Sequence, residues 1–111
     1  MLHRICLTAI VLGLTFSSPS FAEDLQTYEL TLKDAAFSPA EIRVPAGKAF
    51  MIKLTNANNA PAEFESLEMK VEKVAPANST IVVRIKELEA GSYAFVDEFQ
   101  EDVAKGVVIA E

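Results

Sequence analysis

The sequence has a single histidine and a single cysteine, His3 and Cys6, and no tryptophan. Both residues lie within residues 1–22, which we interpret as a leader that is removed on export. A mature chain without cysteine cannot form a disulfide, a catalytic thiolate or a thiolate metal site. Without histidine it also lacks Ser-His-Asp catalysis and every imidazole-ligated zinc, copper or haem centre. Its chemistry therefore depends on carboxylate, amide, hydroxyl, thioether and amine groups.

The first residues have the features of a secretory signal peptide. Arg4 precedes an apolar stretch, residues 5–16, and Ser20-Phe21-Ala22 places small residues at the two positions that a signal peptidase reads. The apolar stretch is shorter than the roughly 20 residues that a membrane-spanning helix needs. We therefore predict a signal peptide at residues 1–22 and an exported, periplasmic domain at residues 23–111, with no membrane insertion after cleavage.

The chain is short and acidic. Residues 23–111 are enough for one domain with one hydrophobic core. Sixteen acidic residues against ten basic ones give a formal net charge of −6. This balance argues against nucleic acid and anionic membranes as partners, because both favour clustered Lys and Arg. It favours cations or basic proteins as partners.

Apolar and polar residues alternate in several short segments, which is the period of half-buried strands. Turn-forming residues, such as Pro45-Ala46-Gly47, separate these segments. One stretch, residues 67–73, fits helical and strand spacing about equally well, and both interpretations stay open. Many short strands with regular turns predict an all-β sandwich or barrel. We expect strands within residues 27–33, 42–44, 50–54, 80–85, 93–96 and 107–109.

Four segments are similar to those of small cupredoxins. Phe37 to Gly47 resembles the opening Phe-x-Pro turn, Ile-x-Val strand and Pro-Ala-Gly turn of that superfamily. Phe50 to Asn56 resembles the strand that ends at an Asn before the first ligand loop. Gly91 to Phe95 resembles the Gly-x-Tyr-x-Phe strand, and Gly106 to Ile109 the last strand. The resemblance implies a cupredoxin-like Greek-key β-sandwich of about seven strands. An exported sandwich of immunoglobulin type is the alternative fold.

The same resemblance implies the positions at which a cupredoxin holds its copper. The ligands of a type 1 site are two His, one Cys and a weak axial Met. None of these residue types occupies the corresponding positions, so we expect no type 1 copper and no blue-copper electron transfer. The positions carry Asp97 for Cys, Gln100 for the second His, Ala62 or Glu63 for the first His, and Ala104 or Lys105 for Met.

Two acidic segments surround those positions. They are similar to segments of the EfeO-type and ferrous-iron-permease-associated periplasmic cupredoxins, at Glu63 to Ser66 and at Glu98 to Asp102. Gln100 departs from that pattern, because the relatives have a His there. The resemblance implies that the two segments meet at one end of the sandwich. The carboxylates concerned are Glu63, Glu65, Glu68, Asp97, Glu98, Glu101 and Asp102.

Crowded carboxylates repel one another unless a cation or hydrogen bonds offset the repulsion. Oxygen ligands favour Ca²⁺, Mg²⁺, Mn²⁺ or Fe²⁺, whereas a thioether from Met69 would shift the preference toward copper. Within this predicted site we expect Glu65 and Asp97 to be central. Acidic loops that are simply solvated are the competing interpretation. The predicted metal ligands are Glu63, Glu65, Met69, Asp97, Glu98, Gln100, Glu101 and Asp102.

These observations support two hypotheses of function. The first is a periplasmic protein that binds a divalent metal, iron or copper, and serves a membrane metal-uptake system. The second is a metal-free interaction module whose acidic end docks a basic partner. We expect no enzymatic activity, because no positioned nucleophile accompanies the carboxylates.

Overall fold

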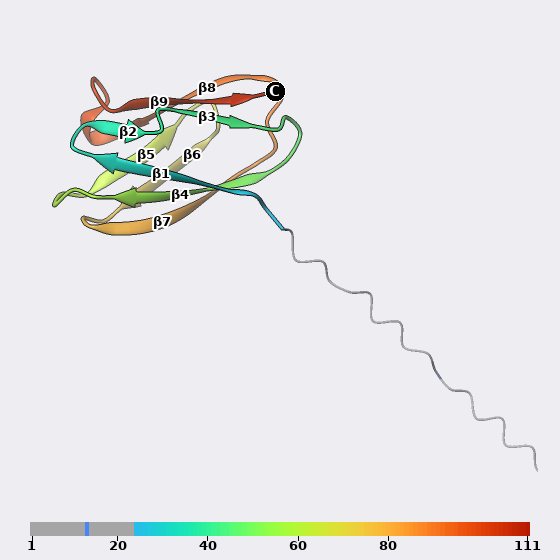
Figure 1. The fold of residues 1–111 in the computed structure, drawn as a ribbon, viewed down its shortest axis with the longest axis horizontal. Coiled ribbons are helices and arrows are strands. Elements are labelled where there is room, and N and C mark those ends of the chain that lie inside the picture. The colour runs from blue at the N-terminus through green and yellow to red at the C-terminus, as the bar shows by residue number, and fades with distance from the viewer. Residues whose placement is uncertain (1–12, 14–23) are drawn as a thin grey trace, which may run out of the picture.

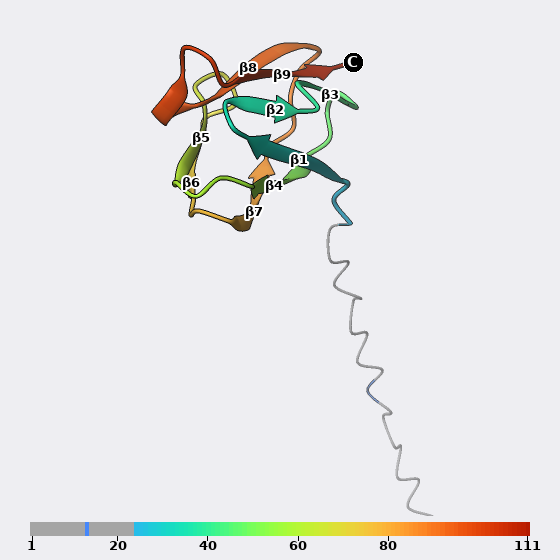
Figure 2. The same ribbon diagram turned by 60° about the vertical axis from the view of Figure 1, so that its left-hand side comes forward.

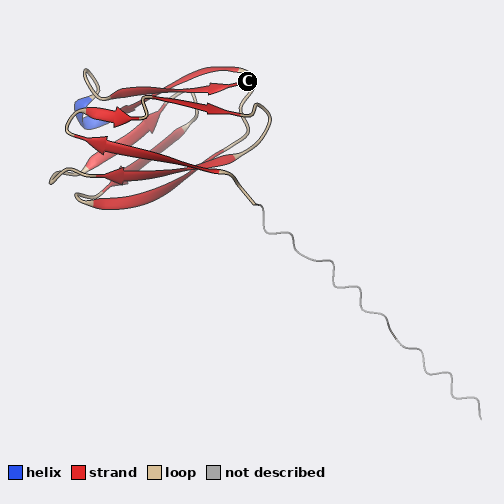
Figure 3. Cartoon of the chain, in the orientation of Figure 1, coloured by secondary structure: helices blue, strands red, loops and turns tan. Residues whose placement is uncertain are grey.

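The computed structural model of the protein describes Gly13 and residues 24–111. Apart from Gly13, the predicted signal peptide, residues 1–22, lies outside the described residues. Residues 24–111 form two β-sheets packed face to face (Figures 1 and 3). This architecture confirms the predicted all-β sandwich. Within the described part of the chain, no helix has the length and hydrophobicity needed to cross a membrane.

The first sheet has four strands in the order β2-β1-β4-β7. β1 runs parallel to β4, and the other pairs are antiparallel. In β1, Leu30 and Leu32 are buried while Glu29 and Thr31 are exposed, as expected for a strand with one face in the core. The strands are β1 (Thr27–Lys33), β2 (Ala36–Ser38), β4 (Phe50–Asn56) and β7 (Ser79–Ile85).

The second sheet has five strands in the order β3-β9-β8-β5-β6. β3 runs parallel to β9, and the remaining pairs are antiparallel. A single 3₁₀ turn, η1 (Glu98–Gln100), lies between β8 and β9. The strands are β3 (Glu41–Val44), β5 (Ala62–Ser66), β6 (Val71–Ala75), β8 (Gly91–Asp97) and β9 (Lys105–Ala110).

Aromatic side chains fill the space between the sheets near the end of β8. The ring of Phe95 lies 5.0 Å from that of Phe37, edge to face, and 5.2 Å from that of Phe64. Burying each such ring contributes about 1.5–3 kcal/mol to stability. Gly106, the register partner of Phe95, leaves room for this ring, because a Cβ at that position would collide with it. The core therefore fixes β8, which carries the segment leading to η1.

The structure has nine strands in its described part, so the prediction of about seven was too low. The missing strands are short or carry charged residues at alternate positions. β2 has three residues within a segment interpreted as a turn, and β5 has the sequence Ala-Glu-Phe-Glu-Ser, which resembles a loop in composition. β6 lies in and beyond the ambiguous stretch 67–73, whose second half is extended.

β5 and β6 lie along one side of the sandwich, with β6 beside β7 (Figure 2). Lys73 Nζ donates a hydrogen bond to the carbonyl of Val82 at 2.7 Å and so links the edges of the two sheets. Asn56, which is fully buried, donates to the carbonyls of Ala60 and Ala75 at 2.9 and 3.1 Å. The amide of Asn56 therefore fixes the start of β5 and the end of β6 against β4.

Candidate metal centre

Asp97, the last residue of β8, is only 1% exposed. Its Oδ1 accepts hydrogen bonds from the backbone N–H of Glu63 at 2.9 Å and of Phe99 at 3.1 Å. Its Oδ2 accepts one from Nε2 of Gln100 at 3.1 Å. Three donors thus satisfy this buried carboxylate, as burial of a polar group requires. Asp97 caps η1 and joins β8 to β5.

The outer face of β5 carries Glu63 and Glu65, since Phe64 between them points into the core. The antiparallel register places Glu72 of β6 opposite Glu65. Residues opposite each other in a ladder share a face of the sheet, so Glu72 also lies on the outer face. On the other side of β5, the chain leaves β8 at Asp97, and Glu98 begins η1. Three separate segments therefore deliver carboxylates to one place.

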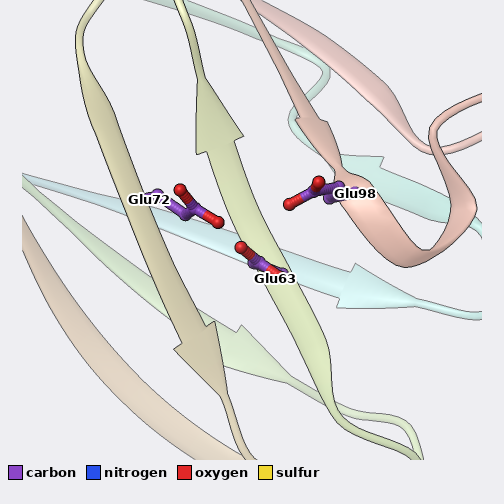
Figure 4. Close-up of side chains that lie close together, drawn as sticks. All are labelled: Glu63, Glu72 and Glu98. Atoms are coloured by element: carbon purple, nitrogen blue, oxygen red, sulfur yellow. The ribbon is translucent and has the colours of Figure 1, made fainter.

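Glu63, Glu72 and Glu98, which we call the acidic triad, each offer a carboxylate oxygen, and these oxygens all lie within 4.8 Å of one another. In Figure 4 the three carboxylate groups point toward one another from β5, β6 and η1. Glu72 and Glu98 are exposed, but Glu63 is only 9% exposed. The triad therefore has one buried member beneath two that solvent reaches.

The environment of Glu63 raises the pKa of its carboxyl group to about 7. The largest cause is the interaction with Glu72, followed by burial and the interaction with Glu98. The pKa of Glu65 is also raised, by Glu98, by burial and by the negative charges of Glu72 and Glu101. The charged groups that govern both pKa values are all acidic. A cation at this place would remove the repulsion that raises them.

The structure brings together four of the predicted ligands on the outer face. Glu63 and Glu98 are in the triad, Glu65 lies next to it, and Glu101 acts electrostatically on Glu65. The convergence of the two acidic segments therefore holds in the structure. Glu63 and Glu65 both belong to the short strand β5 and lie on the same side of it.

The structure places the other predicted ligands differently. Asp97 lies below the outer face with three N–H donors on its carboxylate, and Gln100 is one of those donors. Met69 is buried in the hydrophobic core at 7% exposure. Asp102 is exposed in the turn that follows η1. Metal ligation by these four residues stays a prediction, and their geometry favours structural or solvated roles.

Glu72 is the triad member that sequence reasoning missed. It lies in the stretch whose secondary structure was ambiguous, and it has no counterpart in the resemblance to cupredoxins. Its position follows from the pairing Glu65 to Glu72, which a single sequence does not reveal. The segment Val71-Glu72-Lys73-Val74 does not alternate apolar and polar residues, so it carried no clear strand signal.

The end of the sandwich at which the resemblance implies copper does not fit a type 1 site. Residues 24–111 contain neither Cys nor His, so thiolate and imidazole ligands are absent from this part of the chain. The residue at the implied Cys position, Asp97, already accepts three hydrogen bonds. The donor set available on the outer face consists of carboxylate oxygens, which suit harder divalent ions.

A two-sheet sandwich with this strand order is the fold of cupredoxin-type β proteins. The sequence model described as "Cupredoxin-like domain" matches residues 6–110. The chain therefore belongs to the family of cupredoxin-like domains.

The chain is also similar to individual proteins. "Uncharacterized protein RP394" of Rickettsia prowazekii is 28% identical over 87 residues, which are 78% of this chain and 70% of the relative. The metal-binding domain of the Cu(I)-exporting P-type ATPase CopA of Streptococcus pneumoniae, solved with Cu(I), superimposes with a TM-score of 0.70 at 18% identity, covering 78% of this chain and 86% of that one. Auracyanin A, a blue copper protein of Chloroflexus aurantiacus, superimposes with a TM-score of 0.67 at 16% identity, covering 77% and 98%. At such identities, the two structures establish the fold alone.

Proposed function

We propose that the protein is an exported, periplasmic cupredoxin-like protein that binds a divalent metal ion at the acidic triad and serves a membrane metal-uptake system. The observation that carries this proposal is that Glu63, a residue only 9% exposed, holds its carboxylate beside those of Glu72 and Glu98. A buried negative charge with negative neighbours is costly unless a cation compensates it. A divalent cation bound by the triad would supply this compensating charge.

The triad geometry suits an ion with oxygen ligands. Divalent ions bind carboxylate oxygens at about 2.0–2.6 Å, so two oxygens on opposite sides of an ion lie roughly 4–5 Å apart. The triad oxygens lie within 4.8 Å of one another without an ion. Small side-chain rotations would therefore bring all three into contact with one ion. Glu65, directly opposite Glu72, is placed to add a fourth oxygen.

The chemistry of the ligands favours Fe²⁺, Mn²⁺ or Ca²⁺ over copper, because the triad has neither thiolate nor imidazole. Of the two metals expected for an uptake accessory, iron therefore fits better than copper. The relatives with bound copper share the fold, and this similarity supports a metal-related role in general. We propose a binding role rather than an enzymatic one.

Isothermal titration calorimetry tests the proposal. The protein lacking residues 1–22, freed of metal with a chelator, is titrated with Fe²⁺ under anaerobic conditions and with Mn²⁺, Ca²⁺ and Cu²⁺, at pH 7.5 and 0.15 M NaCl. We expect one ion per chain. The triple variant Glu63→Gln, Glu72→Gln, Glu98→Gln should lose this binding.

A control variant separates coordination from net charge. Glu29, Glu87 and Glu89 are exposed and outside the triad, so the triple Gln variant at these positions changes the charge equally. It should bind the ion as the wild type does. Equal binding by the triad variant, or no heat from any ion, would refute the metal site. The link to uptake is tested separately, by growth of a deletion strain under metal limitation, which wild-type protein should restore and the triad variant should not.

A further inference from the structure

The outer face of the second sheet has a second feature, where β5 and β8 separate. The two strands pair only at Phe64 with Asp97 and at Glu65 with Val96. Beyond this point side chains replace the ladder. Ser66 Oγ donates to the carbonyl of Ala94 at 2.7 Å, and the N–H of Ala94 donates to Oε2 of Glu68 at 2.9 Å. The separation is thus built into the hydrogen bonding and leaves a depression over β8.

A groove of about 310 Å³ occupies this depression. Its apolar part includes Ala94, Val96 and Leu67, and the side of Leu67 is open to solvent, with 83% of the residue exposed. Glu65, Glu68 and Glu101 also line it, and no lysine or arginine does. The groove therefore combines an apolar surface with negative charge, next to the triad but outside it.

The combination selects between kinds of cation. A hydrated metal ion gains nothing from contact with Leu67 and Val96. A lysine or arginine side chain has an aliphatic portion that covers apolar surface and a cationic end that stays near water and carboxylates. Glu65, Glu68 and Glu101 all line the groove, so their negative charges lie close to one another there. A cationic group among them offsets the repulsion between these charges.

We infer that this groove docks a lysine- or arginine-bearing segment of a partner protein, with the aliphatic part of the basic side chain on Leu67 and Val96 and its cationic end between Glu65 and Glu101. None of the triad residues lines the groove, so the inference is tested on the metal-free protein; Glu65, which is placed to add a fourth oxygen to the metal, is shared by the two sites. The inference gives the acidic residues of this surface a role in recognition. The groove favours a basic partner because its negative charges complement lysine and arginine.

An NMR titration with N-acetyl-hexalysine amide as the probe tests the inference, using the metal-free protein lacking residues 1–22 with a chelator present. At 20 mM NaCl, backbone amide shifts should move most for residues 65–68 and 94–96. Because surface charge pairs are screened by salt, the affinity should fall at least fivefold at 300 mM NaCl. Shifts centred on another surface would overturn the inference.

Two variants and a matched control distinguish the groove from general charge attraction. Glu65→Gln with Glu101→Gln should weaken binding at least fivefold, and Leu67→Ser about twofold to threefold, because the aliphatic contact is lost. Both variants should fold, since Glu101 and Leu67 are exposed and Glu65 is half-buried. Glu29→Gln with Glu87→Gln, an equal charge change elsewhere, should weaken binding less than twofold. Equal loss in both double variants, or no effect of Leu67→Ser, would contradict the docking groove.

Discussion

Asp97 and Glu63 are two buried acidic residues joined by a hydrogen bond from the backbone N–H of Glu63 to Oδ1 of Asp97, yet the surroundings of their carboxylates are opposite. Asp97 accepts three N–H groups, one of them from the backbone of Glu63 itself. The side chain of Glu63 instead faces the carboxylates of Glu72 and Glu98. A carboxylate surrounded by donors holds the fold together, whereas one surrounded by like charges is ready for a cation. Burial alone therefore does not distinguish a structural carboxylate from a candidate ligand.

The largest effect should come from removing the structural carboxylate. Asp97→Ala leaves the buried N–H of Glu63 and the partly buried N–H of Phe99 without an acceptor and should lower the free energy of unfolding by about 3–4 kcal/mol. Urea denaturation followed by circular dichroism measures this. Asp97→Asn keeps one oxygen for both N–H groups and should cost about 1–2 kcal/mol. A loss below about 1 kcal/mol for the alanine variant would contradict a structural role.

Metal addition should distinguish the role of Glu63 from that of Asp97. With Mn²⁺ at a hundred times its dissociation constant, the wild type should gain about 2.7 kcal/mol of stability, because the ion binds only the folded state. Glu63→Gln should abolish this gain without loss of metal-free stability. Asp97→Asn should be less stable yet keep the gain. Thermal unfolding with and without Mn²⁺ measures the metal-free stability and the metal-induced gain of each variant. If Asp97→Asn abolished the gain and Glu63→Gln kept it, Asp97 would be the ligand and Glu63 the structural residue.

A smaller effect is expected at the third donor to Asp97. Gln100→Ala removes the hydrogen bond at 3.1 Å from Nε2 to Oδ2, in a partly solvated position. Such a bond contributes about 1 kcal/mol. The same urea denaturation should show this loss, with metal affinity within twofold of the wild type. A larger loss of metal affinity than of stability would instead make Gln100 a ligand, as the resemblance to cupredoxins implies.

The pH dependence of stability should show the raised pKa of Glu63. The folded protein holds this proton up to about pH 7, whereas an unperturbed carboxyl titrates near 4.5. Unfolding therefore releases a proton between these values, and the contribution of Glu63 to the free energy of unfolding falls as the pH rises through this window. Glu63→Gln removes that contribution. Relative to wild type, the metal-free variant should become more stable between pH 5 and pH 8, and parallel pH curves would contradict the raised pKa.

Much of the fold was predictable from the sequence, because the strands with a clear alternation of apolar and polar residues, such as β1 and β7, carry their own signal. β5 and β6 were not predictable, since alternating glutamates on an outer face have the composition of a loop. The convergence of Glu63, Glu65 and Glu98 followed from the resemblance to cupredoxins. The membership of Glu72 and the satisfied state of Asp97 depend on strand register and backbone donors, which residue types do not specify.

The strand pairing of β5 with β6 has a consequence for how an ion would exchange. Two of the three triad glutamates extend from adjacent paired strands, whose spacing of about 4.8 Å hardly changes. Capture and release would then need only side-chain rotations, which take picoseconds to nanoseconds at an exposed surface. The third glutamate comes from a short turn at the rim. Such a preformed, open arrangement suits a carrier that passes its cargo on quickly better than a store that retains it.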